Sequence, residues 1–330
     1  MSFNLRNPEN SEKGALRHIW KSVFGGTDED IFFNNYYTPG NCIVAESGGI
    51  IAGAGHLLPF GNLVSGNLVS GDRGIPGALR DATNTLRNTP NASHSTPNAS
   101  RSIHCAMIYA VATLPEYRSR GLGGAVVREL IAKGQEKGYP AIVLCPSEDS
   151  LFGYYSARSG LKDWFYVNES VFDAPMTGSS SIELTAQEPE AYARLRGGLL
   201  SGIPHINMDV RALSYQNCLC RHYGGGMYMA ASPEGVSCLT VELQPGGEVL
   251  VKELLTPVNS DSGGIISGIL SAVASSFPAG KYIVRTPAVN GCSPLSGFEA
   301  RRFGMLASPE DLISGNYAIN PPPWYGFAFD

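Results

Sequence analysis

The sequence predicts an α+β protein with two similar halves, each a mixed, mostly antiparallel sheet flanked by helices. Between residues 103 and 145, a buried strand, a glycine-rich loop, an amphipathic helix and a second apolar strand follow one another. After residue 182, helices, a three-strand meander, a helix and a strand repeat this plan. The chain has 330 residues, and single hydrophobic cores stop growing at about 250–300 residues.

Apolar residues at helical or alternating spacing define the elements of the first half. Asp28 can cap the second helix, and the stretch 46–49 has the composition of a hairpin turn. Gly138 follows a helix end, where glycine favours termination. On the strand 103–113, we expect Cys105, Met107, Tyr109 and Val111 to share one face. The expected elements are helices at 11–24 and 29–37, strands at 42–45, 50–58 and 103–113, a helix at 124–137, a strand at 141–145, a helix at 150–158 and a strand at 164–172.

The interval 61–102 breaks this pattern. Residues 61–65 are copied as 66–70, and the sequence of 89–93 recurs at 96–100. Loops longer than about 12–15 residues are uncommon and are usually lids or disordered segments. We therefore expect a low-complexity insertion here.

The second half begins after a small polar run that follows residue 174, which predicts domains at 1–174 and 175–330. Residues 324–329 alternate aromatic and small side chains, so they are also expected to form a strand rather than a frayed tail. The other elements expected are a strand at 182–186, helices at 189–200 and 209–222, strands at 227–231, 238–243 and 249–256, a helix at 264–277 and a strand at 282–286.

Composition narrows the function. The chain is 43% hydrophobic and 16% charged, which is enough apolar material for a large core. A net charge of -5 argues against nucleic acid as a partner and mildly favours a cationic substrate. Seven scattered cysteines without a CxxC pair, a polar N-terminus and no long apolar stretch predict a cytoplasmic protein that neither enters nor crosses a membrane. The spacing of His, Asp and Cys indicates no metal site.

The chemistry is predicted to lie in the loop 111–124, with the sequence VATLPEYRSRGLGG. A buried strand leads into it, Pro115 ends that strand, and an amphipathic helix begins at its last glycine. Backbone N–H groups without Cβ atoms, at the positive end of a helix, suit a pyrophosphate. Arg118 and Arg120 can add charge-assisted contacts. The alternative is a glycine-rich turn with solvated arginines.

This loop resembles the cofactor motif of the GNAT acetyltransferases, Arg/Gln-x-x-Gly-x-Gly/Ala, and the similarity extends from residue 12 to about 172. The resemblance implies acetyl-CoA as cosubstrate, with its thioester between the strands 103–113 and 141–145. It assigns the pantetheine arm to backbone groups of Val111, Ala112 and Thr113. It assigns the pyrophosphate, beside Arg118, to Ser119, Arg120, Gly121, Leu122, Gly123 and Gly124.

The second half also resembles a GNAT domain, but residues 257–264 lack the pyrophosphate motif and contain a carboxylate. We expect this degenerate domain to shape the acceptor cleft without binding cofactor. The tandem arrangement is similar to acetyltransferases of the enhanced-intracellular-survival type, although the chain is too short for their third, sterol-carrier-like domain.

The acid and the base are less sharply defined. The family's Phe-Tyr-x-x-x-Gly-Phe segment corresponds to residues 151–161. Counting forward from the start of this segment makes Tyr155 the proton donor. Counting back from Gly160 gives Ser156 in that role instead. In the alternative interpretation, Tyr154 or Tyr155 is only a packed aromatic side chain. In survival-type enzymes the terminal carboxylate reaches the active site, which makes Asp330 a candidate base beside His56 and His104.

Three functions are compatible with these features. The first is an N-acetyltransferase that acts on an amine of a small molecule or peptide, and the second is a non-catalytic acyl-CoA-binding regulator. The third, an aminoacyl-transferase that uses charged tRNA, is disfavoured by the intact glycine loop and by the lack of a basic stripe. We expect the first.

Overall fold

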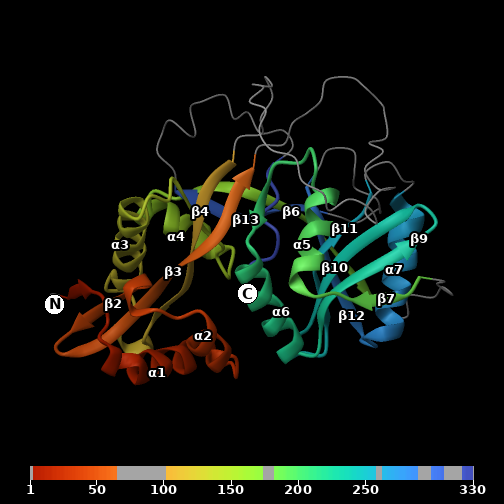
Figure 1. Cartoon of the computed structure of the whole chain (residues 1–330). Helices are drawn as coiled ribbons and strands as arrows, with labels where there is room; N and C mark the ends of the chain where they lie inside the picture. The colour runs from red at the N-terminus through yellow and green to blue at the C-terminus, as the bar shows by residue number, and fades with distance from the viewer. Residues whose placement is uncertain are drawn as a thin grey trace, which may run out of the picture.

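A computed structural model describes residues 3–64, 102–173, 182–257, 262–288, 299–307 and 322–329. Within these residues, thirteen strands form one continuous sheet, and helices cover both of its faces (Figure 1). The described helices are α1 (Lys13–Phe24), α2 (Glu29–Asn35), α3 (Leu122–Glu136), α4 (Ser150–Ser159), α5 (Pro189–Leu199), α6 (Val210–His222) and α7 (Ser262–Ser276). The described strands are β1 (Asn4–Arg6), β2 (Cys42–Ser47), β3 (Ile50–Val64), β4 (Ser102–Thr113), β5 (Ala141–Leu144), β6 (Lys162–Asp173), β7 (Leu184–Ala186), β8 (His205–Met208), β9 (Gly226–Ser232), β10 (Gly235–Leu243), β11 (Val249–Leu255), β12 (Lys281–Pro287) and β13 (Glu299–Ala307).

The two halves share one plan, which confirms the predicted fold class. In the first half β4 and β5 are parallel and are joined through α3. In the second half β11 and β12 are parallel and are joined through α7. The other pairings are antiparallel, in the order β1-β2-β3-β4-β5-β13-β6-β12-β11-β10-β9-β7, with β8 on β3. The strands β1, β8 and β13 were not predicted.

The halves exchange partners at the centre of the sheet. Strand β13, which comes late in the chain, lies between β5 and β6, with Met305 opposite Leu144. Strand β6 also pairs with β12, so that Ser170 lies opposite Val284. The sheet is therefore continuous across both halves.

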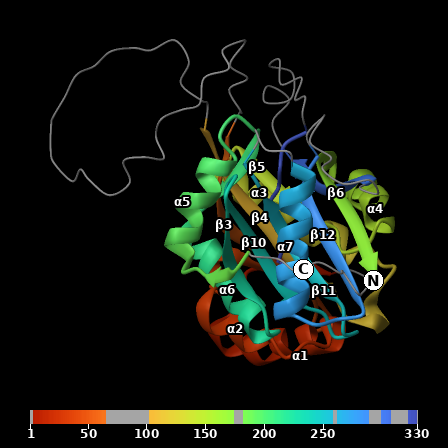
Figure 2. The same cartoon turned by 90° about the vertical axis from the view of Figure 1, so that its right-hand side faces the viewer.

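Three cores hold the layers together. One core packs α3 and α4 against β2 to β5, and another packs α7 against β9 to β12. The largest joins α1 and α2 to α5 and α6, with the segment 322–329 between them. Figure 2 shows α5 and α6 on the same side of the sheet, with α1 and α2 below them. This junction is where the two halves build a common cavity.

The predicted insertion is shorter than its sequence indicates. Residues 61–64 continue β3, where Leu63 lies opposite Ile103 of β4 and Ile206 of β8. Residue 102 begins β4. A Cβ atom on Gly61 would lie 2.1 Å from the carbonyl oxygen of Asn207, so the glycine lets β8 approach this closely. The rest of the predicted insertion, 65–101, lies outside the described residues.

The segment 322–329 is buried, but it is not the strand that was predicted. Its one bridge joins Trp324 to His205, and Trp324 also donates its backbone N–H to Pro204 O at 2.8 Å. Gly326 has φ +90°, which interrupts the extended backbone. The aromatic side chains of Trp324 and Phe327 are fully buried.

A buried ion pair anchors this segment to the second half. Arg196 Nε donates to both carboxylate oxygens of Glu253 at 3.0 Å, and Trp324 Nε1 donates to Glu253 as well. Tyr192 donates to Glu253 Oε1 at 2.9 Å. At most 2% of each of these side chains is exposed. Because the carboxylate is desolvated, these donors stabilise its charge.

No helix within the described ranges is long and apolar enough to cross a membrane.

Candidate active site

The parallel strands β4 and β5 separate at the point where the thioester was predicted. Their pairing runs from Cys105 and Ala141 to Ile108 and Leu144, and it ends there. Beyond this point β4 contains a bulge opposite Gly55, and Ala110 has φ +50°. The opening leaves one backbone edge of β4 accessible.

The bulge corrects one sequence expectation. Cys105, Met107 and Tyr109 share the face that packs on α1 and α2, as predicted. Val111 instead packs with the opposite core, under α3. The extra residue at Ala110 reverses the alternation of side chains.

The glycine loop forms a cradle of free backbone donors. Ser119 and Gly121 have φ of 63° and 82°, and α3 starts at Leu122, two residues earlier than predicted. Within the described structure, the N–H groups of Ser119, Gly121, Leu122 and Gly123 have no protein acceptor. Successive free N–H groups at a helix start favour an anion.

The two loop arginines are held by backbone carbonyls. Arg118 Nε donates to Thr113 O at 3.2 Å, and Arg120 Nη2 donates to Glu116 O at 2.7 Å. The Arg120 guanidinium also lies over the ring of Tyr117 at 5.0 Å. Both positive charges therefore stay close to the cradle.

Tyr154 closes one side of the cradle. Its hydroxyl accepts the N–H of Gly124 at 2.9 Å. A Cβ atom on Gly123 would lie 3.4 Å from this hydroxyl and 3.7 Å from Thr113 Oγ1, and both are ordinary van der Waals distances. The donor set and the small residue fit a phosphate group that lies directly on the backbone.

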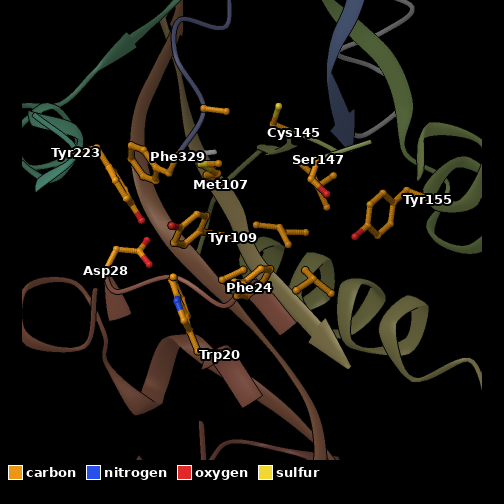
Figure 3. Close-up of a pocket in the computed structure, with 16 residues that line it drawn as sticks. Trp20, Phe24, Asp28, Met107, Tyr109, Cys145, Ser147, Tyr155, Tyr223 and Phe329 are labelled. Atoms are coloured by element: carbon orange, nitrogen blue, oxygen red, sulfur yellow. The ribbon is translucent and has the colours of Figure 1, made fainter. Parts of the chain in front are cut away.

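A cavity of about 320 Å³ extends from the β4–β5 opening toward the second half (Figure 3). Side chains of both halves line it, with Tyr155 at one end and Asp28 and Tyr223 at the other. The described residues that line it are Trp20, Phe24, Gly26, Asp28, Met107, Ile108, Tyr109, Ala110, Val111, Leu144, Cys145, Ser147, Tyr155, Tyr223, Ala328 and Phe329.

Of the alternatives on α4, Tyr155 lines this cavity, whereas Ser156 is exposed and does not. Only 7% of Tyr155 is exposed. Burial raises the pKa of its hydroxyl to about 12. The hydroxyl therefore remains protonated at neutral pH and can donate a proton.

The two histidine candidates lie elsewhere. His56 is buried against the rings of Phe32 at 4.7 Å and Phe33 at 6.3 Å. Desolvation lowers its pKa to about 3, so the ring is neutral and aromatic packing accounts for its position. His104 is exposed on β4, opposite Asn62. Neither is among the cavity residues.

Asp28 is the functional candidate that sequence reasoning missed. It was interpreted as a helix cap, but its side chain makes no capping hydrogen bond. A Cβ atom on Gly26 would lie 2.4 Å from Asp28 Oδ1 and 3.4 Å from Tyr223 Oη, so both oxygens face the space above Gly26 (Figure 3). The glycine pair that precedes Asp28 is the one sequence signal for this arrangement.

Phe329 brings the C-terminal segment to the cavity. Its ring packs against Tyr109 at 5.5 Å and against Tyr215 at 4.9 Å. The candidate Asp330 lies outside the described residues, and so does most of the stretch 257–264. No group of three metal-ligating side chains occurs in the described part of the chain.

Part of the sequence and the fold are both similar to those of GNAT-type acyltransferases. Residues 13–154 match the sequence profile of the Acetyltransferase (GNAT) family. No curated protein matches the sequence.

Solved structures with the same fold span nearly the whole chain. A GCN5-related N-acetyltransferase from Anabaena variabilis has a TM-score of 0.61 and 15% identity, covering 92% of this chain and 72% of its own. One from Kribbella flavida has a TM-score of 0.59 and 15% identity, with coverages of 92% and 70%. Eis1 from Mycobacterium abscessus has a TM-score of 0.54 and 12% identity, with coverages of 93% and 73%. The likeness to Eis1 agrees with the predicted tandem arrangement.

Proposed function

We propose that the protein transfers the acetyl group of acetyl-CoA to an amine of a small molecule or peptide. One observation carries this proposal: a single cavity connects the β4–β5 opening, next to the glycine loop, with the Asp28 carboxylate on the far side, which has no partner among the described residues. An acetyl donor and a cationic acceptor can therefore meet in it. In this proposal residues 1–174 bind the donor, and residues 175–330 complete the acceptor side.

Free backbone N–H groups support acetyl-CoA as the acetyl donor. The N–H groups of Ser119, Gly121, Leu122 and Gly123 bind the pyrophosphate, together with the charges of Arg118 and Arg120. The open edge of β4 at Val111, Ala112 and Thr113 binds the pantetheine arm by backbone hydrogen bonds. Acetyl-CoA supplies an activated acyl group at the point where the strands separate.

Three side chains are assigned to the transfer itself. Asp28 binds the acceptor ammonium, and Asp330 takes its proton through a water. The amine nitrogen then attacks the thioester carbonyl, and the carbon–sulfur bond breaks. Tyr155 donates a proton to the departing sulfur, which leaves as the free thiol, and the second proton released by the acylated nitrogen restores the Tyr155 hydroxyl. The protonated state of Tyr155 at neutral pH supports its role.

Release of free thiol from acetyl-CoA tests this function. A panel of primary amines is offered to the protein at neutral pH, with hydrolysis in the absence of amine as the baseline. Amine-dependent thiol release supports the proposal. Tight acetyl-CoA binding without thiol release from any amine identifies the protein instead as an acyl-CoA-binding regulator.

Gly123→Ala tests the cradle. We expect acetyl-CoA affinity to fall about tenfold or more, because the new methyl group meets the phosphate, whereas the protein itself has room for it. The Tm without ligand should stay the same or rise, since alanine favours a helix over glycine by about 0.5–1 kcal/mol. Calorimetric titration with acetyl-CoA measures the first effect and thermal unfolding the second.

Gly153→Ala on α4 is the matched control. It has no atom within 4 Å of its Cβ position, so it should leave acetyl-CoA binding unchanged. Equal affinities of Gly123→Ala and the unmodified protein would remove the loop from the binding site.

Asp330→Asn tests the base. We expect kcat to fall about 10²-fold with unchanged acetyl-CoA affinity, a loss within the range of general base catalysis. Asp28→Asn should instead raise KM for the amine, because it removes the charge that binds the ammonium. A normal kcat in Asp330→Asn would exclude the Asp330 side chain as the base.

A further inference from the structure

The acceptor half of the cavity is walled by aromatic rings. Trp20 packs edge-on against Phe24 at 5.2 Å and against Tyr109 at 5.9 Å. Tyr109 in turn contacts Phe329 at 5.5 Å with perpendicular planes. The rings come from α1, β4 and the segment 322–329, and together they surround the approach to Asp28 (Figure 3).

The rings differ in how firmly they are held. Trp20 and Phe329 are 4% and 6% exposed, so packing fixes them. Phe24 is 46% exposed and forms the rim. An apolar ligand that enters past Phe24 therefore meets a preformed wall, and little side-chain entropy is lost on binding.

The described lining of this cavity carries little charge. Of the described residues that line it, Asp28 alone carries a formal charge. Its carboxylate accepts no hydrogen bond from a described residue. A single ammonium group satisfies this carboxylate and also gains from the neighbouring ring faces.

A second cavity of about 170 Å³ continues from the first and shares Asp28, Tyr223 and Phe329 with it. Leu219, Leu243 and Pro245 give it apolar walls.

The other carboxylate of this second cavity, that of Glu242, is already paired. Glu242 receives Lys252 Nζ at 3.1 Å and Gln244 Nε2 at 2.9 Å. Glu242 and Lys252 are 5% and 0% exposed, so their charges cancel in a buried environment. A second ammonium placed here would lose its hydration without gaining a free counter-charge.

From these walls we infer that the acceptor is an arylalkylamine-type substrate: one primary ammonium that binds Asp28, carried on an aromatic or bulky apolar body that extends into the second cavity. Polycationic and polyhydroxylated amines are selected against, because their polar groups remain unpaired against rings and aliphatic side chains. This inference rests on the proposed function and identifies its acceptor class.

Equilibrium binding tests the inference independently of turnover. The protein saturated with CoA, which has no acetyl group to transfer, is titrated with 2-phenylethylamine, n-butylamine, 1,4-diaminobutane and kanamycin. We expect 2-phenylethylamine to bind at least about tenfold more tightly than 1,4-diaminobutane, a difference of about 1.4 kcal/mol. The monoamine n-butylamine should bind more tightly than 1,4-diaminobutane, which has the same four carbons and carries a second ammonium on the terminal one. Equal or tighter binding of 1,4-diaminobutane or kanamycin overturns the inference.

The same amines are then compared in thiol release from acetyl-CoA. A kcat/KM highest for 2-phenylethylamine supports both the inference and the proposed function. Selective binding of 2-phenylethylamine without turnover of any amine would contradict the proposed acetyltransferase function and would still support the binding site for this class of amine. Turnover that favours kanamycin would contradict the arylalkylamine inference and would still support the proposed acetyltransferase function.

Leu243→Asp tests the second cavity directly. Leu243 is 36% exposed, so the variant should fold, and its new carboxylate should tighten 1,4-diaminobutane and weaken 2-phenylethylamine. Val171→Asp on β6 is the matched control, since Val171 is 53% exposed and lines neither cavity. An unchanged ratio of the two Kd values in Leu243→Asp shows that the amine body does not lie there and overturns that assignment.

Discussion

Replacing Tyr155 with phenylalanine should lower kcat by about 10²-fold or more, within the range for loss of a general acid. The ring remains in its buried position between α4 and the cavity, so packing is retained and only the hydroxyl is lost. Acetyl-CoA affinity should not change, because in the proposed mechanism the proton is needed only when the carbon–sulfur bond breaks. Steady-state kinetics together with calorimetric titration separate the two effects.

Tyr154→Phe is the matched control on the adjacent residue. Its hydroxyl accepts the N–H of Gly124 at the cradle and is not among the cavity residues. We expect it to weaken acetyl-CoA binding several-fold and to change kcat little. If both variants lose kcat equally, or if Tyr154→Phe alone loses it, Tyr155 is not the proton donor.

Glu253→Gln should destabilise the fold by about 3–5 kcal/mol, the usual cost of leaving one partner of a buried ion pair uncompensated. Arg196 is 2% exposed, and its other described acceptor is the neutral carbonyl of Ile206, to which Nη1 donates at 2.8 Å, so no second carboxylate among the described residues compensates its charge. The variant also weakens the acceptor of Trp324 Nε1. Denaturant unfolding measures the loss.

Glu188→Gln provides the comparison for this loss. Glu188 pairs with Arg221 at 3.0 Å, but both side chains are more than half exposed, at 72% and 53%. Exposed pairs contribute within about 1 kcal/mol, so the midpoint should hardly move. Equal shifts of the unfolding midpoint in the two variants would mean that water solvates the Arg196 guanidinium when Glu253 is changed.

The sequence predicted those helices and strands whose pattern of side chains lies within one continuous segment. The strand, loop and helix around Gly121 and Gly123 were recognisable because glycine spacing and apolar periodicity occur together. Strand β13 was missed because Glu299, Arg301 and Arg302 occupy its first part, and its pairing partners on β5 and β6 are remote in sequence. Strand β8 has four residues, too few for a period to be detected.

The candidate site was predictable only where one segment supplies it. The cofactor loop is such a segment. Asp28 and Tyr223 come from opposite halves, and their approach depends on how α2 packs beside α6. The bulge at Ala110 gave no signal, because alanine seldom adopts a positive φ. The acceptor side of the site therefore depends on tertiary contacts, which the sequence patterns do not reveal.

The position of β13 has a consequence for how the protein is made. When residues 1–173 leave the ribosome, β5 and β6 both present edges whose partner, β13, has not yet been synthesised. Unpaired edges of apolar strands promote association between chains. The facing edges of β5 and β6 therefore stay unpaired until residues 299–307 have been synthesised. Nascent chains stalled before residue 299 should consequently be bound by chaperones far more strongly than chains released at full length.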